Sequence, residues 1–557
     1  MTTPAPSTTH LRSDAIAVAM TGAWLLIVRA ALECPWGFMP RPTPGGVNVG
    51  IVFNPIDTWF YLSWVQQYLA GEWHAGLLYT TEPHLALLWL FPLWTVGHIA
   101  AWTGWSPIGV FNVAGYAGAL ASVCFFRRAA RAIDLSPSAC DWATTVLLLG
   151  SGGSWLFHAL HRLGWAIEVH GGELDYLDLF PSTTMHVYAY HALGLAMLTA
   201  LWWCVAELEK RLRERWGARR WVLAVVVVAL LLGFSRPYEP AAFLAAYALK
   251  TAGCWLRRRN DSDSWRACYF SVRLVAAALA PGLAWTAYVA LQPFWGTFAH
   301  QALALGQSRA GWLAAFGGLW ILAAVGIRPA LRLPSSQGLL PVIAVALSLV
   351  VLAGLASIQI KLASGLFVGV ALVGGLGAET IVCWLRQRLS SVWVVVVGAA
   401  VLAVALGTGS LAMNLLAIRL KGPALLDPEL ISTARAIPII SRHRPPVVLT
   451  DSRVGNILPG LIGARVWAGH WAITDRFAAK QLETRRAGLD PEFPPDNSAS
   501  LGHPLLRIVT DTRFDYALLD QRCARAIEML KSHGWTPFYR TEHWMLLRAP
   551  SSPACAR

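Results

Sequence analysis

Residues 51–84 contain the side chains whose types and positions are best suited to chemistry. Asp57 heads a Trp- and Tyr-rich segment with the pattern of a helix, and Glu82 and His84 lie just before the next apolar run. A carboxylate placed where an apolar helix meets water costs free energy unless it is paired or functional. Asp57 is therefore the candidate general base, a group that accepts a proton from a reacting hydroxyl.

Both acidic residues also have structural explanations. Asp57 follows Asn54 and Pro55 and precedes a helix-like run, a position at which Asp caps a helix well. Glu82 precedes Pro83, so this pair could simply begin a helix with proline in its first turn. Capping does not exclude catalysis, and the sequence leaves both explanations open.

The composition is that of a polytopic membrane protein. Of the 557 residues, 56% are hydrophobic and 14% are charged, and the mean hydropathy is +0.49. The 28 Trp residues fit interfacial belts. The net charge of +14 comes from basic residues in short loops, which indicates the positive-inside topology rule and not nucleic-acid binding. The nine Cys show no paired spacing, so we expect buried free thiols.

A series of apolar runs have close to the ~20 residues that a bilayer crossing requires. They cover residues 14–33, 85–103, 107–126, 142–160, 186–206, 221–235, 238–256, 270–291, 311–327, 339–357, 364–384 and 391–415. Basic clusters fall in every second loop, which orients the N-terminus toward the cytoplasm. The run 85–103, broken by Pro92 and Gly97, is then re-entrant or lies along the outer interface. We expect a polytopic α-helical protein with about 11–13 transmembrane helices.

From about residue 419 the pattern changes to alternating short strands and helices. Residues 445–470 read as strand, polar turn, short helix and strand, and residues 513–548 as strand, helix and closing hairpin. This alternation predicts a small α/β domain, which the topology puts on the outer face. The predicted domains are a cytoplasmic tail at 1–13, a membrane domain at 14–418 with an outer loop at 34–84, and an outer domain at 419–557.

Two segments of the predicted outer domain are polar enough to face an active cavity. They are residues 451–456 (DSRVGN) and 468–471 (AGHW), although turn chemistry explains them as well. The domain has no nucleophile motif and no glycine-rich phosphate loop. We therefore expect it to position an acceptor or to cover the site.

Four basic residues near the bilayer lie on the outer side of the predicted topology. They are Arg162, Arg236, Arg309 and Lys361. An anionic phosphate at the outer membrane surface would bind such groups through charge-assisted hydrogen bonds. Each could instead extend to the interface or pair locally, and Arg236 could pair with Glu239 three residues on. Lys361 is the best candidate because it is the only basic residue between two long apolar runs.

The second predicted outer loop is rich in acids and imidazoles. Its candidates are Glu168, Glu173, Asp175, Asp178, His161, His170 and His186. A solvated acidic loop explains them equally well. Carboxylate and imidazole groups could also bind a divalent metal ion here, but their spacing matches no specific metal motif.

Several motifs along residues 14–550 are similar to those of a known protein class. They are NPIDTWFYLSWVQQYLAGEW, LYTTEPH, LLLGSGGSWL, TTMHVYAYHALGLA, SRPYEP and LTDSRVGNILPGLIGARVWAGHWAITDRFAAKQ. With an acid in the first outer loop, many spans and an outer soluble domain, the chain resembles the GT-C class of integral membrane glycosyltransferases. These motifs also look like those of a group of bacterial membrane proteins assigned to that class.

The resemblance implies an activity and its partners. The expected reaction moves a sugar from a polyprenyl-phosphate donor to a hydroxyl of a lipid, glycan or protein acceptor. It takes place at the outer face of the bacterial inner membrane, among membrane lipids. A single displacement without an enzyme nucleophile inverts the sugar configuration. The competing hypotheses are a transporter or flippase for lipid-linked glycans, and a non-catalytic membrane scaffold. Transporters tend to have inverted repeats and acids at the bilayer midplane. This sequence shows no repeat and its acids lie in predicted outer loops, which counts against a transporter.

The resemblance also implies roles for particular residues. Asp57 matches the general base of the class, and the substrate-binding candidates are Glu82, His84, Asp175, Asp178, His186, Arg236 and Lys361. Many members of the class carry two adjacent acids at the first position. Here Thr58 follows Asp57, so the chain departs from the adjacent-acid pattern at that point.

Overall fold

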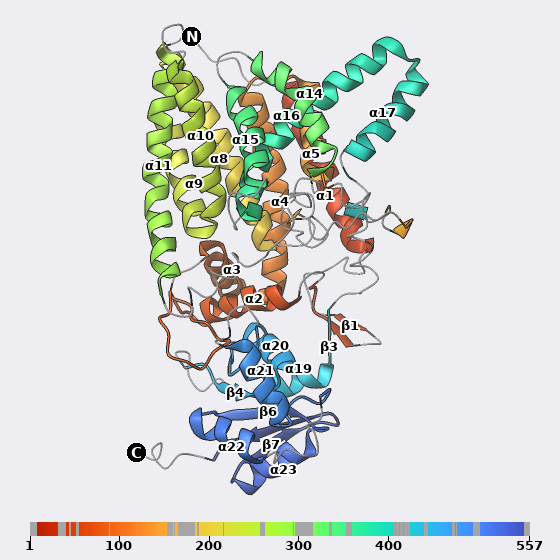
Figure 1. Cartoon of the computed structure of the whole chain (residues 1–557). Coiled ribbons are helices and arrows are strands. Elements are labelled where there is room, and N and C mark those ends of the chain that lie inside the picture. Colours follow the sequence, from red (N-terminus) through yellow and green to blue (C-terminus); the bar gives the residue numbers. More distant parts are fainter. Residues whose placement is uncertain are drawn as a thin grey trace. The chain divides into compact units, whose positions relative to one another are not determined.

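The computed structural model divides into two compact units, which are described separately (Figure 1). Unit 1 consists of Met1–Pro35, Val113–Tyr288 and Ala302–Gly422, and unit 2 of Trp36–Asn112, Val289–Gln301 and Pro423–Arg557. The residues that the structure describes are 8–31, 41–43, 46–51, 55–87, 90–152, 160, 162–164, 184–185, 189–215, 217–256, 262–292, 295, 316–333, 337–352, 359–405, 407, 411–412, 416, 424–438, 444–470, 474, 476–493 and 502–550.

Unit 1 is built from helices. They are α1 (Thr8–Ala31), α5 (Pro137–Leu149), α8 (Ala189–Glu214), α9 (Arg219–Ser235), α10 (Tyr238–Leu256), α14 (Leu319–Leu331), α15 (Leu339–Val350), α16 (Gln359–Arg388), α17 (Ser391–Ala405) and most of α4 (Pro107–Ala132) and α11 (Ser262–Ala290). Helix α16 packs against α5, α10, α14 and α15. A Cβ on Gly377 of α16 would lie 1.9 Å from the carbonyl oxygen of Leu322 in α14. Such small residues allow the close helix contacts that are typical of membrane bundles.

Among the described residues, four helices are long and apolar enough to cross a membrane. They are Pro107–Ala132, Tyr190–Glu214, Ser262–Ala290 and Leu362–Arg388. Shorter apolar helices cover Asp14–Ile27, Leu319–Leu331, Leu339–Val350 and Ser391–Ala400. The chain is therefore a multi-pass, mostly helical membrane protein, which confirms the prediction from composition. The total number of crossings and the orientation of the termini stay predictions.

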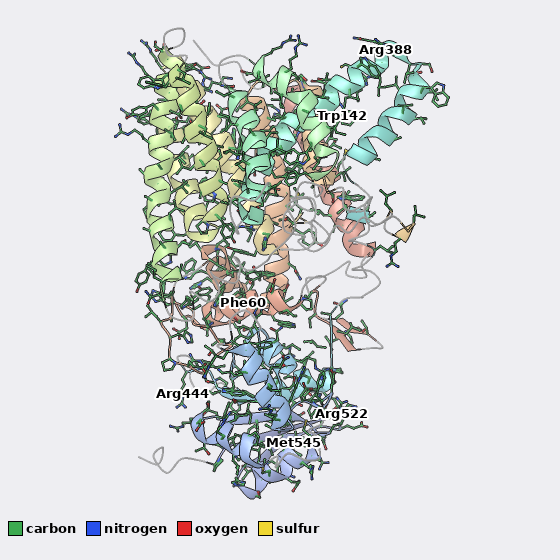
Figure 2. All side chains as sticks on the ribbon, in the orientation of Figure 1. Phe60, Trp142, Arg388, Arg444, Arg522 and Met545 are labelled. Carbon is green, nitrogen blue, oxygen red and sulfur yellow. The ribbon has the colours of Figure 1, made fainter. Side chains whose placement is uncertain are left out.

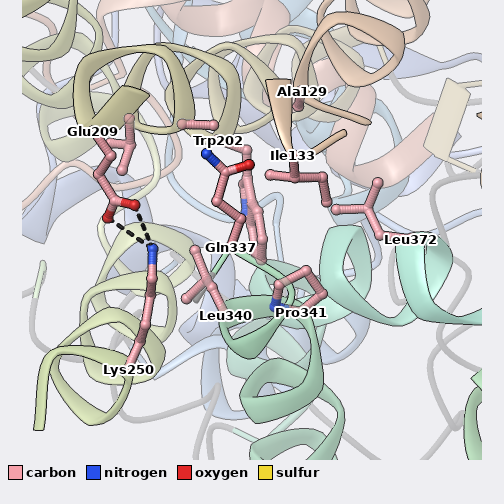
Figure 3. Close-up of a pocket in the computed structure, with 11 residues that line it drawn as sticks. Ala129, Ile133, Trp202, Glu209, Lys250, Gln337, Leu340, Pro341 and Leu372 are labelled. Atoms are coloured by element: carbon pink, nitrogen blue, oxygen red, sulfur yellow. Dashed lines mark hydrogen bonds and ion pairs between the residues drawn. The ribbon is translucent and has the colours of Figure 1, made fainter. Parts of the chain in front are cut away.

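A pair of charges deep in unit 1 neutralises itself. Lys250 Nζ lies 2.6 Å from Glu209 Oε2, and the two side chains are only 3% and 1% exposed. The hydroxyl of Tyr247 donates to the same carboxylate. Figure 3 shows Lys250 and Glu209 pointing toward each other beside a cavity lined by Trp202 and other side chains. Removing Lys250 would leave the buried Glu209 with only Arg213, at 3.9 Å, as a cation, so we assign the Lys250–Glu209 pair a structural role between α8 and α10.

Unit 2 contains a five-stranded sheet with the strand order β5-β4-β6-β8-β7. The strands are β4 (Val447–Leu449), β5 (Arg465–Val466), β6 (Tyr516–Asp520), β7 (Thr536–Arg540) and β8 (Trp544–Arg548). Strand β4 runs parallel to β5 and β6, and β8 runs antiparallel to β6 and β7. The helices between and beside them are α19 (Pro428–Arg435), α20 (Ser452–Ile462), α21 (Phe477–Arg486), α22 (Gly502–Asp511) and α23 (Ala524–Ser532). The predicted C-terminal α/β fold is thereby confirmed.

Unit 2 brings together residues 36–112 and the C-terminal residues from 423 onward. Strand β2 (Gly46–Asn48) pairs with β1 (Arg41–Thr43) on one side and with β3 (Leu425–Leu426) on the other. Helix α2 (Pro55–Leu69) packs against α20, and a Cβ on Gly460 would lie 2.5 Å from the carbonyl oxygen of Trp59. Residues on both sides of the boundary predicted near 419 therefore belong to one compact unit, while the assignment of domains to membrane and outer face stays a prediction.

The uncertain segment 85–103 contributes helix α3 (Phe91–Thr103) to unit 2. Its 13 residues span about 20 Å, which is less than the ~30 Å of a bilayer's hydrocarbon core. It packs against α2, where a Cβ on Gly97 would lie 2.5 Å from the Cβ of Tyr68. This helix is thus too short to cross a membrane upright.

Candidate active site

Asp57 lies in the first turn of α2. The helix begins at Pro55, so Asp57 is its third residue and not the residue before the helix. The positive end of the helix dipole favours a carboxylate at this position. Trp59, Trp64 and Tyr68 are at most 1% exposed and anchor the helix in unit 2. The helix therefore holds Asp57 at a fixed end of a well-packed element.

The partner of Asp57 is His470. His470 Nε2 lies 3.1 Å from Asp57 Oδ1, and the histidine side chain is 2% exposed whereas 36% of the aspartate side chain is exposed. The imidazole packs against Phe60, labelled in Figure 2, at a ring distance of 5.3 Å. An ionised Asp57 accepts a hydrogen bond from the tautomer that is protonated at Nε2. The pair thus combines a buried, fixed imidazole with a carboxylate that solvent and substrates can reach.

The backbone around His470 is fixed by a compact set of hydrogen bonds. The Thr474 N–H donates to the carbonyl of His470 at 2.9 Å, and its hydroxyl donates to the carbonyl of Tyr79 at 2.9 Å. The ring of Tyr79 meets the imidazole edge-on at 5.8 Å, and its hydroxyl donates to the carbonyl of Asn456 at 3.2 Å. Burial raises the pKa of Tyr79 well above its usual value, so this residue stays neutral and serves as packing.

Glu82 is tied to Lys480. Lys480 Nζ lies 2.5 Å from Glu82 Oε1, and the hydroxyl of Thr80 donates to the other carboxylate oxygen. Burial alone would raise the pKa of Glu82, but the hydrogen bonds from Lys480 and Thr80 outweigh it and lower the pKa. Lys480 is 4% exposed and lies over the ring of Trp467 at 5.4 Å. This pair connects α21, which contains Lys480, to the loop that contains Tyr79 and Glu82.

His84 is locked by the backbone of its own loop. Its Nδ1 lies 2.8 Å from the carbonyl of Glu82, and its Nε2 accepts the Leu77 N–H at 2.7 Å. Burial lowers the pKa of His84, so the neutral imidazole with a proton on Nδ1 is favoured. The ends of the loop are joined by an antiparallel bridge between Ala75 and Leu87. Since α3 begins only at Phe91, the alternative of a helix starting at Glu82 is wrong.

The other predicted substrate-binding residues are not brought to Asp57 by the described contacts. Arg236, in unit 1, pairs with Glu239 at 2.7 Å, and the side chains are 3% and 5% exposed. This is the local pairing that the sequence offered as an alternative. Lys361 is the third residue of α16, and its side chain lies outside the described residues. Asp175, Asp178 and His186 also lie outside them.

Two residues of the site were missed as individual candidates. His470 belongs to the AGHW segment, which the sequence marks as polar enough to face a cavity, but nothing there names Asp57 as its partner. Lys480 carries no local signal at all. The DSRVGN segment forms the start of α20 and not a turn: Asp451 caps the helix by accepting the N–H groups of Arg453 and Val454 at 2.7 and 3.0 Å.

Among the described residues, one cluster offers three metal-ligating atoms close together. It consists of Glu429, Glu542 and His543, whose ligand atoms lie within 4.8 Å of one another. The carboxylate of Glu429 already accepts the His543 N–H at 2.9 Å. The cluster does not include Asp57, whose described partner is an imidazole and not a second carboxylate.

No protein-family model and no curated protein matches the chain. Among solved structures, it is similar to the oligosaccharyltransferase of Archaeoglobus fulgidus tethered to an acceptor peptide, with a TM-score of 0.52, 11% identity, and coverage of 98% of this chain and 74% of that one. The oligosaccharyltransferase AglB from Archaeoglobus fulgidus, in complex with an inhibitory peptide and a dolichol-phosphate, gives a TM-score of 0.51 and 10% identity, with coverage of 97% of this chain and 74% of that one. ArnT from Cupriavidus metallidurans bound to undecaprenyl phosphate gives a TM-score of 0.48 and 12% identity, with coverage of 96% of this chain and 99% of that one.

At such low identity, the similarity to the oligosaccharyltransferase shows a shared fold. The chain is a multi-pass membrane protein with the fold of the GT-C class, which confirms the fold expected from the sequence motifs.

Proposed function

We propose that this protein is a membrane glycosyltransferase that moves a sugar from a polyprenyl-phosphate donor to an acceptor hydroxyl. The observation that carries the proposal is the Asp57–His470 pair, in which a buried imidazole at 3.1 Å orients a carboxylate that remains 36% exposed. The shared fold with an oligosaccharyltransferase supports it. One of the related structures holds a dolichol-phosphate, which is a lipid of the proposed donor type.

In the proposed reaction, Asp57 acts as the general base. The acceptor hydroxyl gives its proton to the Asp57 carboxylate as its oxygen forms a bond to the anomeric carbon. The bond between that carbon and the phosphate oxygen breaks, and polyprenyl phosphate leaves with the electron pair. Attack on the face opposite the leaving group inverts the configuration of the sugar. A positioned base of this kind typically contributes about 10²–10⁴-fold to the rate.

His470 and the Glu82–Lys480 pair are proposed as positioning residues. The imidazole of His470 holds one oxygen of Asp57, and its ring is fixed by Phe60 and Tyr79. Glu82 and Lys480 secure the loop that carries Tyr79. A contact of Lys361 to the lipid phosphate, and location in a bacterial inner membrane with an outer C-terminal domain, stay part of the proposal, whereas Arg236 is paired with Glu239 and is left out of it.

The experiment is a donor screen with the full chain reconstituted in lipid vesicles. Polyprenyl-phosphate sugars carrying different hexoses and pentoses are supplied with membrane lipid or glycan acceptors, and release of polyprenyl phosphate is measured. We expect one donor class to be consumed in an acceptor-dependent way, with inverted configuration in the product. Movement of labelled lipid-linked sugar across the vesicle membrane without cleavage of the sugar–phosphate bond would instead identify a transporter.

A further inference from the structure

A cavity of ≈ 460 Å³ lies at the carboxyl end of α2, within unit 2. Its wall includes Gln66, Glu72 and His74 from the end of α2 and the following turn, and Pro446 and Arg465 from the sheet. The volume falls within the range of about 300–1,000 Å³ that is typical of small-molecule sites. Nine positions of helix separate Asp57 from Gln66, the nearest α2 residue of the cavity wall, which corresponds to about 14 Å along α2. The cavity is therefore distinct from the Asp57–His470 pair.

Arg465 brings a positive charge to the wall of this cavity. In the part of the chain that the structure describes, Arg465 has no ion pair, and its Nε is buried without a hydrogen-bond partner. Burial is the one cause that lowers the pKa of Arg465, and the guanidinium remains charged. Its backbone N–H donates to the carbonyl of Pro446 at 2.9 Å, which fixes the residue at the start of β5. A partly buried cation of this kind is complementary to an anion.

The remaining wall suits the hydroxyls and the apolar face of a sugar. The amide nitrogen of Gln66 donates to the carbonyls of Gly460 and Leu461 at 3.2 and 3.1 Å, so its oxygen is left as an acceptor. The carboxylate of Glu72 accepts hydroxyl protons, and the exposed imidazole of His74 can donate or accept. Leu69, Ala70, Ala86 and the two prolines supply apolar surface.

We propose that this cavity binds an acidic sugar residue, whose carboxylate or phosphate pairs with Arg465 while its hydroxyls contact Gln66 and Glu72. The planar guanidinium matches either anion with two parallel hydrogen bonds. Glu72 on the same wall disfavours a bare anion and favours a ligand that offers hydroxyl donors beside its acidic group. The role of this sugar as part of the acceptor rests on the proposed function. The binding of the sugar to the cavity does not.

Binding to the full chain in nanodiscs of a zwitterionic lipid tests the proposal. The probes are glucuronic acid, glucose 6-phosphate and, as the neutral control, glucose. We expect the wild type to bind at least one acidic probe about tenfold more tightly than glucose, with affinity that falls as salt rises. Binding of glucuronic acid alone or of glucose 6-phosphate alone identifies the anion as carboxylate or phosphate. Equal affinity for glucose and both acidic probes contradicts the proposal.

Variants separate the charge of Arg465 from general effects. R465Q should lose the preference for acidic probes, and R465K should keep part of it because it retains the charge without the fork geometry. The matched control is R507Q, which removes an exposed guanidinium that pairs with Glu483 elsewhere in unit 2. If R465Q fails to fold, Ala86→Trp fills the cavity while leaving Arg465 in place, and it should abolish binding. Unchanged binding in R465Q, or in a folded Ala86→Trp variant, overturns the site.

The Asp57→Asn variant keeps this test independent of the proposed transfer reaction. It leaves the cavity intact, so it should bind the acidic probes with wild-type affinity. A wild type that transfers sugar but shows no preference for acidic probes would remove the cavity proposal alone. Preferential binding without any transfer activity would leave the cavity standing and remove the proposed reaction.

Discussion

Two side-chain pairs, one in each unit, differ in how far their partners are exposed. In unit 1, Lys250 and Glu209 are 3% and 1% exposed, so the pair is closed on both sides. In unit 2, His470 is 2% exposed, but Asp57, its partner, is 36% exposed. The first arrangement cancels two charges inside packed helices. The second buries only the group that orients and leaves the carboxylate accessible, which is the geometry that a general base requires.

The comparison also explains why burial by itself does not identify a functional charge. Arg236 and Glu239 in unit 1 are paired at 2.7 Å and almost fully buried, like Lys250 and Glu209. A buried pair is costly to break and cannot easily release a charge to a substrate. Burial of both partners therefore argues for a structural role of these two pairs.

The largest effect on stability is expected when the Lys250–Glu209 pair of unit 1 is broken. Lys250→Met leaves the buried Glu209 with only the more distant Arg213 at 3.9 Å, so the variant should be destabilised by at most about 3–5 kcal/mol. Adding Glu209→Gln to the same variant should recover most of that loss. Thermal unfolding of the two variants in one detergent measures both effects. Equal stability of Lys250→Met and the wild type would contradict the structural role of the pair.

Asp451 sharpens the comparison because it is buried with backbone donors instead of a cation. Burial raises the pKa of Asp451 from 3.8 to about 6, so the folded protein binds its proton more tightly than the unfolded chain does. Its contribution is therefore full below pH 3.8 and is lost as the pH rises through about 6. Asp451→Asn keeps the helix cap and should reduce this pH dependence by at most about 3 kcal/mol. Unfolding measured at pH 4 to 8 checks it; an unchanged profile would contradict the shifted pKa.

Replacing His470 tests the contribution of its imidazole to the Asp57–His470 pair. His470→Ala should lower the transfer rate by about 10–100-fold, because a charge-assisted hydrogen bond that orients Asp57 is lost. His470→Gln can still donate a hydrogen bond and should lose less. The split between kcat and KM distinguishes positioning from binding: we expect the loss in kcat. If His470→Ala changes only the melting temperature, the imidazole is structural.

The smallest effect is expected at the Glu82–Lys480 pair. It is less buried than the Lys250–Glu209 pair and less exposed than Asp57. Lys480→Met leaves Glu82 with Thr80 as its remaining described side-chain donor and should cost about 1–2 kcal/mol of stability. The double variant with Glu82→Gln should be closer to the wild type in melting temperature. Since both residues are assigned to positioning, a loss of sugar transfer greater than that of His470→Ala would contradict the assignment.

Local patterns in the sequence predicted much of this architecture. Hydropathy predicted the helical membrane part, alternating strands and helices predicted the α/β fold, and the spacing of three residues predicted the Arg236–Glu239 pair as an alternative. Asp57 was found because an acid at the head of an apolar helix is unusual.

The partners across the site could not be predicted in the same way. Asp57 and His470 are 413 positions apart, and Glu82 and Lys480 are 398 apart. Neither helical nor strand periodicity links residues at such separations, so only the packing of α2 and its following loop against the C-terminal residues reveals them. The locked state of His84 likewise depends on the backbone path of its loop, which the sequence did not indicate.

The most direct test of the account compares sugar transfer by Asp57→Asn with transfer by the wild type in the same vesicles. The matched control is Glu492→Gln, which changes an exposed acid that pairs with Arg453 at 2.8 Å in the same unit. The account predicts a loss of about 10²–10⁴-fold for Asp57→Asn at normal expression and melting temperature, and no loss for the control. A well-folded Asp57→Asn variant that transfers sugar at the wild-type rate would contradict the assignment of Asp57 as the base.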